Sequence, residues 1–438
     1  MTDLQSLSRR GALAGALGLG MSVQFLGARA RAAAPGLEHR KLVVFVCRGG
    51  MDGLSVSPPV GDPNYAALRG AIAIPGFGQA GGALKLDDTF GLHPSLARVH
   101  ALAQAGQARI APAVATPDRA RSHFEAQDVL ESGAAQVYGV PSGWLNRSLE
   151  AMPARPPAMS VGPTAPLILR GRIEAASWSP GEGSDRDTRL PGILQDLYAG
   201  DPMLSRALAS GLATEAMART ATADARATLT PASAPAGAAP TATPTMASQP
   251  AGMDAGGAAL RPVLRQGLPQ ARQLGATLAG FMVQSGGPQV AAVSVDGFDT
   301  HANQGAAQGQ LAVRLAYLDA VIDGLVSGLG PAWNDTVVVA ATEFGRTARI
   351  NGTGGTDHGT ASTALLLGGA LKRGGIVGDW PTLAQGRLFE DRDTAPTLDM
   401  RGLFKGVLAE HLGVDRHALD ATVFPDSGGV APATGIVV

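Results

Sequence analysis

Three short runs of apolar residues, each closed by a polar loop, stand out along the chain. They span Lys41–Cys47, Val290–Asp296 and Thr336–Thr342, and in each run the residues of both faces are mainly apolar. A strand that is apolar on both faces and ends in glycine or polar residues is typical of a parallel sheet covered by helices. We therefore predict one buried parallel strand in each run.

Segments with helical spacing lie between or near these runs, at residues 94–105, 122–131, 262–285 and 309–329. Strands that alternate with helices indicate an α/β fold with a mostly parallel central sheet flanked by helices. In such folds, catalytic and binding groups gather at the carboxyl ends of the strands. We expect the polar loops after the three apolar runs to form one site.

The first 32 residues have the pattern of an export signal. Arg9-Arg10 precede a weakly hydrophobic, uncharged stretch up to Ala28, and small residues in an Ala-x-Ala pattern lead to Ala32. This pattern is typical of a twin-arginine signal peptide. We expect the twin-arginine translocase to export the chain, cleavage near Ala32, and a periplasmic or secreted mature protein. An uncleaved membrane anchor is the alternative.

A second compositional shift covers residues 218–258, which are rich in Ala, Thr, Pro, Ser and Gly and poor in large apolar side chains. Such a segment buries too little apolar surface to offset the entropy of ordering it, which predicts a disordered insertion. An arm that docks on a partner is the alternative. The insertion would divide one α/β domain into residues 33–217 and 259–438.

Charge and motif content exclude several classes of protein. With 35 basic and 36 acidic residues the formal net charge is −1, so binding to nucleic acid has no electrostatic support. A single cysteine, Cys47, excludes an intramolecular disulfide and a cysteine metal cluster. The sequence contains no Gly-x-Ser-x-Gly elbow, no Walker loop and no His-Glu-x-x-His helix.

Acidic residues and histidines follow the predicted strands. Carboxylates and imidazoles gathered at one sheet edge are the ligands that a hard or borderline divalent cation requires. A structural alternative exists for each, since an Asp in a glycine-rich turn commonly accepts backbone N–H groups. The candidate metal ligands are Asp52, Asp299, His301, Glu343, Asp357 and His358.

Two further residues are candidates for catalysis, and one for substrate binding. Ser122 is expected at a helix N-terminus, where it either forms a capping box with Glu125 or acts as a nucleophile in the positive field of the helix. His123, beside it, is a candidate acid/base group, a metal ligand or a packed residue. Arg346 can hold an oxygen of an anionic substrate bidentately, or pair with Glu343 or another nearby acid.

A series of short motifs runs along most of the chain on both sides of residues 218–258. In order they read Arg9-Arg10, Phe45-Val-Cys-Arg-Gly-Gly-Met-Asp-Gly-Leu54, Gly91-Leu-His-Pro94, Arg121-Ser-His-Phe124, Gly143-Trp-Leu-Asn146, Asp299-Thr-His301, Thr342-Glu-Phe-Gly-Arg-Thr347 and Thr356-Asp-His-Gly359. This series resembles the exported family called domain of unknown function 1501, which is grouped by fold similarity with alkaline phosphatases and sulfatases. The resemblance implies a metal-dependent hydrolase fold and supplies no substrate.

The resemblance also implies roles for individual residues. Asp52 resembles the metal-binding acid after the first strand, and Ser122 resembles the nucleophile that opens a helix. Asp299 and His301 resemble the ligand pair of one metal ion, and His358 resembles its later histidine.

The chain departs from the superfamily at Glu343-Phe344, where the superfamily has Asp-His. Glu343 can replace the acid, but Phe344 cannot ligate a metal. A second metal site would therefore keep only Asp52, Glu343 and Ser122 or a neighbour, which puts two-metal catalysis in doubt.

Together these observations favour an exported hydrolase of phosphate or sulfate esters that uses a serine nucleophile and one or two divalent ions (zinc, calcium, magnesium or manganese). Its expected substrate is a small anionic ester or a cell-surface polymer. The alternative is a catalytically degenerate binding or assembly protein on the same fold. Redox or lyase chemistry at the same metal is a third reading, because a fold does not determine a reaction.

Overall fold

The computed structural model describes residues 36–152, 155–162, 165–180, 190–229 and 255–438. The predicted signal peptide, residues 1–32, lies outside the described residues. None of the described helices combines the length and the apolar character needed to cross a membrane.

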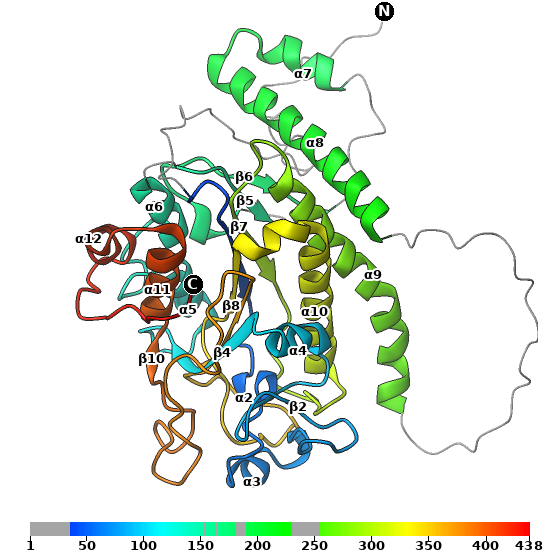
Figure 1. The fold of residues 1–438 in the computed structure, drawn as a ribbon, viewed down its shortest axis with the longest axis vertical. Coiled ribbons are helices and arrows are strands. Elements are labelled where there is room, and N and C mark those ends of the chain that lie inside the picture. The colour runs from blue at the N-terminus through cyan, green and yellow to red at the C-terminus, as the bar shows by residue number, and fades with distance from the viewer. Residues whose placement is uncertain (1–35, 153–154, 163–164, 181–189, 230–254) are drawn as a thin grey trace, which may run out of the picture.

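An eight-stranded sheet forms the centre of the molecule (Figure 1). Its strand order is β10-β4-β9-β8-β1-β7-β5-β6. β9 pairs antiparallel with both of its neighbours, and every other pairing in the sheet is parallel. The strands are β1 (Lys41–Cys47), β4 (Ala108–Ala115), β5 (Ala158–Val161), β6 (Ala176–Trp178), β7 (Val290–Val295), β8 (Thr336–Ala341), β9 (Ser362–Leu367) and β10 (Leu398–Asp399). The mostly parallel sheet and the three strands predicted from the apolar runs are confirmed.

Helices cover both faces of the sheet (Figure 1). The helices are α2 (Gly53–Val56), α3 (Tyr65–Arg69), α4 (Ala97–Gln104), α5 (His123–Ser132), α6 (Trp144–Ala151), α7 (Leu190–Tyr198), α8 (Pro202–Leu229), α9 (Ala255–Val283), α10 (Gln310–Leu329), α11 (Met400–Leu412) and α12 (Arg416–Ala418). Shorter 3₁₀ turns span Gly70–Ile72, Leu167–Leu169 and Gly330–Asp335, and a π turn spans Leu419–Val423. A separate hairpin pairs β2 (Leu84–Lys85) with β3 (Gly91–Leu92).

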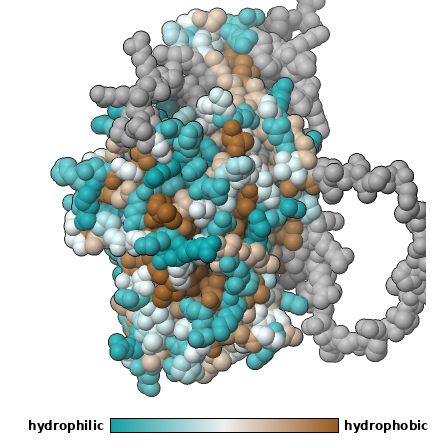
Figure 2. All heavy atoms as spheres, viewed as in Figure 1, coloured by the Kyte–Doolittle hydropathy of each residue, from teal (hydrophilic) through white to brown (hydrophobic). Residues whose placement is uncertain are grey.

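Alternate residues of β1 belong to two different cores. Val43 and Phe45 pack with the apolar side chains of α9 and α10, whereas Leu42 and Val44 pack with those of α6 and α11. Each of these four side chains is at most 1% exposed. This is why β1 reads as a continuous apolar run rather than as an alternating one. On the face drawn in Figure 2, by contrast, hydrophobic residues form small patches among hydrophilic ones.

The expected disordered insertion at 218–258 is partly helical. Residues 218–229 continue α8 and residues 255–258 begin α9, while 230–254 lie outside the described residues. Ala221 is fully buried, and a Cβ placed on Gly280 of α9 would lie 3.0 Å from Ala221. Small residues at this crossing let the two helices approach closely, so the alanines that read as low complexity instead form a helix contact.

Candidate metal centre

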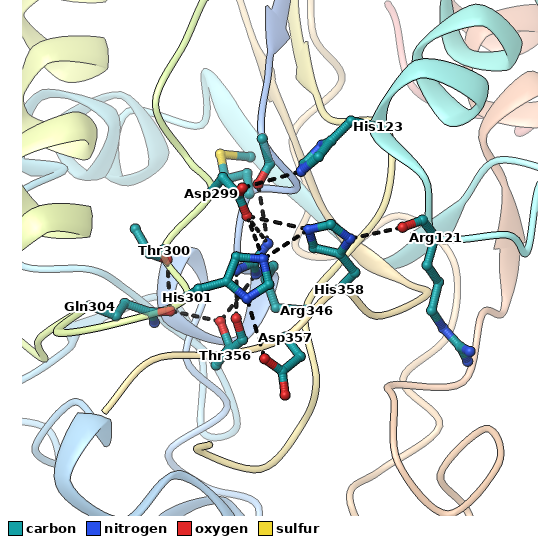
Figure 3. A network of polar contacts seen from close by, with 12 residues as sticks. Arg121, His123, Asp299, Thr300, His301, Gln304, Arg346, Thr356, Asp357 and His358 are labelled. Atoms are coloured by element: carbon teal, nitrogen blue, oxygen red, sulfur yellow. Dashed lines mark hydrogen bonds and ion pairs between the residues drawn. The ribbon is translucent and has the colours of Figure 1, made fainter. Parts of the chain in front are cut away.

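Loops from four parts of the chain meet beyond the carboxyl ends of β7 and β8 (Figure 3). The loop after β7 carries Asp299 and His301, and the loop after β8 leads to Arg346. His123 begins α5, and His358 lies in the loop before β9. The topology thus brings these segments to one edge of the sheet, as the alternation of strands and helices predicts.

Asp299 lies at the centre of this cluster (Figure 3). Its Oδ1 is 3.0 Å from Nε2 of His301 and 3.4 Å from Nε2 of His358, and its Oδ2 is 3.3 Å from Nε2 of His123. The ligating atoms of His123, Asp299 and His358 all lie within 4.8 Å of one another. His301 adds a fourth, because its Nε2 is also 3.0 Å from Nε2 of His358.

Each of the three histidines is held through its other ring nitrogen. Nδ1 of His358 donates to the carbonyl of Arg121 at 2.8 Å. Nδ1 of His123 is 2.9 Å from Glu343 Oε1, and Nδ1 of His301 is 3.3 Å from Asp357 Oδ1. A neutral imidazole that donates from Nδ1 has a lone pair on Nε2. Acceptors on the far side of metal-binding histidines fix this tautomer and orient the ring.

The cluster therefore points three Nε2 atoms at one carboxylate. Nε2 of His123 is buried and makes no hydrogen bond with the described residues. Lone pairs on His301 and His358 that face each other at 3.0 Å repel unless a cation or a shared proton lies near them. The hydrogen bond to Glu343 raises the pKa of His123, whereas burial lowers the pKa of His358.

Glu343 supports the cluster from behind. It is fully buried, its Oε1 accepts from the backbone N–H of Gly49 at 2.8 Å, and its Oε2 accepts from the Thr342 hydroxyl at 2.9 Å. Burial alone would raise the pKa of Glu343, but these hydrogen bonds, with that of His123, hold it below its usual value. The structure places Glu343 behind His123 rather than among the converging atoms.

Asp357 lies behind His301 as Glu343 lies behind His123, because its Oδ1 is near Nδ1 of His301. Its Oδ1 also accepts from the Asn351 amide at 3.0 Å. That hydrogen bond, followed by the one from His301, lowers the pKa of Asp357 despite slight burial. The Asp357 side chain is half exposed, so it anchors the outer histidine from the solvent side.

Phe344 forms a wall of the cluster. Its ring centre lies 4.9 Å from that of His123 and 4.7 Å from that of His358. Gly50, in the loop after β1, has a φ of +64°, and a Cβ there would collide with the Phe344 ring. Phe344 thus packs against two histidine rings of the cluster.

Arg346 pairs with a nearby acid, which is one of the two roles that the sequence left open. Its side chain is fully buried, and Nη1 donates to Asp299 Oδ1 at 2.7 Å. The guanidinium also donates to the hydroxyl and carbonyl of Thr356 and to the carbonyl of Gly49. Although burial acts to raise the pKa of Asp299, Arg346 holds it below its usual value.

Asp52 is committed to a different set of partners. Its carboxylate pairs with Arg69 and accepts from the Ser55 hydroxyl at 2.7 Å and from the Gln304 amide at 2.6 Å. The side chains of Asp52 and Arg69 are 1% and 0% exposed. The contacts of Asp52 among the described residues therefore include none of the three histidines.

Ser122 is the N-cap residue of α5, as expected, but the capping box with Glu125, one of the two roles left open for it, does not form. Its side chain makes no capping hydrogen bond and is half-buried. The residue lies between Arg121, whose carbonyl holds His358, and His123, which belongs to the cluster.

Sequence reasoning did not identify the role of Arg121. Its backbone has a φ of +57°, a left-handed conformation that is uncommon for residues other than glycine and that turns its carbonyl toward His358. Its side chain is held by Asp393 at 2.8 Å and Glu390 at 2.6 Å. The motif around Arg121 gave no signal for this, because a carbonyl partner depends on backbone geometry and not on residue type.

Comparisons with known proteins show the family and leave the substrate undetermined. No curated protein matches the chain. Among solved structures, "Crystal structure of Ps i-CgsB in complex with k-i-k-neocarrahexaose" is similar at a TM-score of 0.38 and 10% sequence identity, covering 89% of this chain and 76% of that one. The sequence model for "Protein of unknown function (DUF1501)" matches residues 39–423, which is most of the chain. The protein belongs to the DUF1501 family.

Proposed function

We propose that this protein is a hydrolase of phosphate or sulfate esters that uses one divalent metal ion bound by His123, Asp299, His301 and His358. One observation carries the proposal: three histidines, each held at Nδ1, direct their Nε2 atoms at a single carboxylate.

The donor set fits a metal ion of the zinc type. Imidazole nitrogen suits zinc and other transition metals, whereas calcium and magnesium prefer oxygen ligands throughout. Two ligand atoms about 2.0–2.1 Å from a tetrahedral zinc ion lie roughly 3.3 Å apart. Oδ1 of Asp299 lies 3.0 Å from Nε2 of His301 and 3.4 Å from Nε2 of His358, and Oδ2 lies 3.3 Å from Nε2 of His123. The ligand atoms of His123, Asp299 and His358 all lie within 4.8 Å of one another. When bound, such an ion supplies Lewis-acid polarisation of an ester oxygen and lowers the pKa of a nearby hydroxyl.

Of the one or two ions that the sequence led us to expect, the proposal keeps one. Asp52 and Glu343 were the remaining acids for a second site. Asp52 is paired with Arg69, and both oxygens of Glu343 accept hydrogen bonds from protein groups. A second ion would have to break a buried ion pair or release His123.

Ser122 is the proposed nucleophile. Its hydroxyl is not used for capping, and the first backbone N–H groups of α5 give this end of the helix a partial positive charge that favours an anionic group. In the proposed reaction Ser122 Oγ bonds to phosphorus or sulfur as the bond to the ester oxygen breaks. The serine loses its proton and the leaving alcohol gains one. Water then cleaves the seryl ester, restores the hydroxyl and releases phosphate or sulfate.

The test combines metal analysis with a panel of phosphate and sulfate esters. The metal-loaded wild type should turn over at least one ester. Ser122→Ala should abolish turnover while keeping the metal. Ser285→Ala, which changes an exposed serine in the turn after α9, should leave turnover unchanged. An active Ser122→Ala protein would contradict the nucleophile, and a wild type without metal would contradict the whole proposal.

One observation favours a second candidate function. Four protein ligands fill a tetrahedral metal site, which is the usual arrangement of structural zinc, whereas catalytic sites keep one position open. The cluster has four such side chains. The second candidate is therefore a binding or assembly protein whose metal stabilises the fold. A metal-loaded protein without turnover, whose Tm falls sharply on metal removal, would favour it.

We also propose that the protein is exported through the twin-arginine pathway with cleavage near Ala32. The motif Arg9-Arg10 and the small residues before Ala32 support this. Replacing both arginines by lysine should retain the precursor in the cytoplasm. N-terminal sequencing of the exported wild type tests the cleavage position.

A further inference from the structure

Two aromatic side chains that are linked to α5, the helix that begins with His123, are largely exposed. Phe124 is 82% exposed and Tyr138 is 72% exposed, and no other aromatic residue is among the large exposed hydrophobic residues in the described part of the chain. Aromatic side chains carry much apolar surface and are usually packed when they have no ligand. Their exposure next to a cluster of ligating residues points to a role in binding.

The structure places the two residues along one side of α5. Phe124 directly follows His123 in the first turn of that helix. Asp128 is four residues further on, and its carboxylate accepts the backbone N–H of Tyr138 at 2.7 Å. Residues four apart on a helix are stacked about 6 Å apart on one side. Tyr138 is therefore anchored one turn along α5 from Phe124.

This side of α5 adjoins the side that forms the metal centre. His123 and Gln127 are also four residues apart, and both contact Glu343. Successive helical residues are rotated by about 100°, so Phe124 and Asp128 lie next to the row that faces the cluster. A ligand that reaches the cluster from this side passes the two aromatic residues.

Tyr138 has an unfavourable backbone conformation. Its φ is +55°, a left-handed conformation that is rare and strained for a bulky residue. The hydrogen bond to Asp128 fixes this conformation against α5. A strained and exposed aromatic residue that is tied to the helix of the metal centre is more typical of a binding surface than of an incidental turn.

We propose that Phe124 and Tyr138 form a stacking surface for the sugar rings of a saccharide chain whose phosphate or sulfate ester groups reach the metal centre. This names the substrate class of the proposed hydrolase and rests on that function. Sugar rings have apolar faces that stack on aromatic rings and hydroxyl groups that remain in water.

The surroundings favour a saccharide over a lipid surface. Glu125, Gln127 and Asp128 lie between or beside the two aromatic residues and are partly exposed. A membrane or an apolar protein partner would require a continuous apolar patch. Separate rings among polar groups instead match a chain of polar units with apolar faces.

Binding to the metal-loaded mature protein tests the proposal without requiring turnover. The probes are dextran sulfate and dextran phosphate, which present the two ester types on sugar rings, and poly(vinyl sulfate), which carries sulfate without rings. We compare wild type with Phe124→Ala and with Tyr138→Asn, because Asn tolerates the left-handed conformation. Leu197→Ala, which removes an exposed apolar side chain from α7, is the control.

Each ring variant should weaken binding of at least one dextran ester by about twofold to tenfold, since an aromatic contact contributes roughly 0.5–1.5 kcal/mol. Binding of poly(vinyl sulfate) and the behaviour of the control should not change. The dextran that responds identifies the ester. No wild-type binding to either dextran, no change in the ring variants, or an equal loss with poly(vinyl sulfate) would overturn the proposal.

Metal analysis and hydrolysis of β-glycerol phosphate and of 4-nitrophenyl sulfate by the wild type are measured on the same preparation. If the metal is absent, or if neither ester is hydrolysed, the proposed function fails whatever the dextrans do. If both are present and the ring variants bind the dextrans like the wild type, only the saccharide surface fails.

Discussion

Asp299 and Asp52 follow neighbouring parallel strands, and both form an ion pair with a buried arginine, yet their surroundings differ completely. Asp52 is buried: its side chain is 1% exposed, and Arg69, Ser55 and Gln304 contact one of its oxygens. Asp299 is 43% exposed, and its two oxygens face the ring nitrogens of three histidines.

The comparison shows what distinguishes a candidate metal ligand from a structural acid at a sheet edge. Arg346 donates a hydrogen bond to Oδ1 of Asp299, whereas Oδ2 of Asp299 is directed toward His123. The hydrogen bonds of the Asp52 carboxylate instead come from the guanidinium of Arg69, the Ser55 hydroxyl and the Gln304 amide. The nature of the facing groups, and not the position after a strand, determines whether a carboxylate can hold a cation.

The two regions are nevertheless connected. Arg346 donates to Thr356, whose hydroxyl donates to Gln304, and Gln304 donates to Asp52. Gln304, Thr356 and Arg346 are each at most 1% exposed. The buried Asp52–Arg69 pair thus lies at one end of a chain of hydrogen bonds whose other end is Asp299.

The largest expected effect is on metal binding. Asp299→Asn should lower metal affinity by at least about 100-fold, because it removes the one charged ligand. Asp52→Asn should keep the metal stoichiometry of the wild type. Equilibrium dialysis followed by elemental analysis measures both, and equal losses in the two variants would remove the distinction between the two aspartates.

For folding stability the order of the two variants should be reversed, with Asp52→Asn more harmful than Asp299→Asn. Asp52→Asn leaves the buried Arg69 without its counter-charge, which should cost about 3–5 kcal/mol in the free energy of unfolding. Asp299→Asn should cost less in the metal-free protein, because Asp299 is partly exposed. Urea unfolding of both metal-free variants checks this, and the reverse ranking would contradict it.

Acid should destabilise the fold through His93, which is fully buried and interacts electrostatically with Asp52. Burial lowers the pKa of His93 from 6.5 to about 4. Its neutral form is favoured in the folded state, so its contribution is present above pH 6.5 and is lost as the pH falls toward 4. The full loss is about 3 kcal/mol.

His93→Asn should make the decline of stability between pH 6.5 and 4 shallower. His411, whose pKa burial also lowers to about 4, should keep its own share of that decline. Urea unfolding of the metal-free protein at a series of pH values provides the measurement. An unchanged slope in His93→Asn would show that His93 does not titrate as a buried neutral group.

A smaller effect on metal affinity is expected from the residue behind His123. Glu343→Gln keeps the shape of the side chain but weakens its hold on the ring, and changes of this kind cost about 10–100-fold in metal affinity. Glu131→Gln, at the buried partner of Arg48 on the same helix as His123, is the matched control and should keep the affinity of the wild type. Equal affinities in Glu343→Gln and wild type would exclude Glu343 as a positioning residue.

The main elements of the fold could be predicted from the sequence. The runs at Lys41–Cys47 and Thr336–Ala341 are strands because burial on both faces leaves a continuous apolar signal. Parallel strands then bring their following loops together, which is why Asp299, His301 and His358 were correctly expected at one sheet edge.

Other features depend on contacts that a sequence does not display. Asp52 pairs with Arg69 through tertiary packing, and Arg121 presents its carbonyl through an uncommon backbone conformation. The sequence left His123 open as an acid/base group, a metal ligand or a packed residue. The structure narrows these roles because it shows Nδ1 of His123 beside Glu343 and Nε2 beside Asp299. Residues 218–229 were misjudged because an alanine-rich helix contact and a low-complexity linker have similar compositions.

The most direct test of the account is X-ray absorption at the metal edge of the metal-loaded wild-type protein, combined with its metal stoichiometry. The account predicts one ion per chain with nitrogen and oxygen ligands and the scattering pattern of three imidazole rings. A protein that binds no metal, an ion without imidazole ligands, or a pair of metal ions would contradict it.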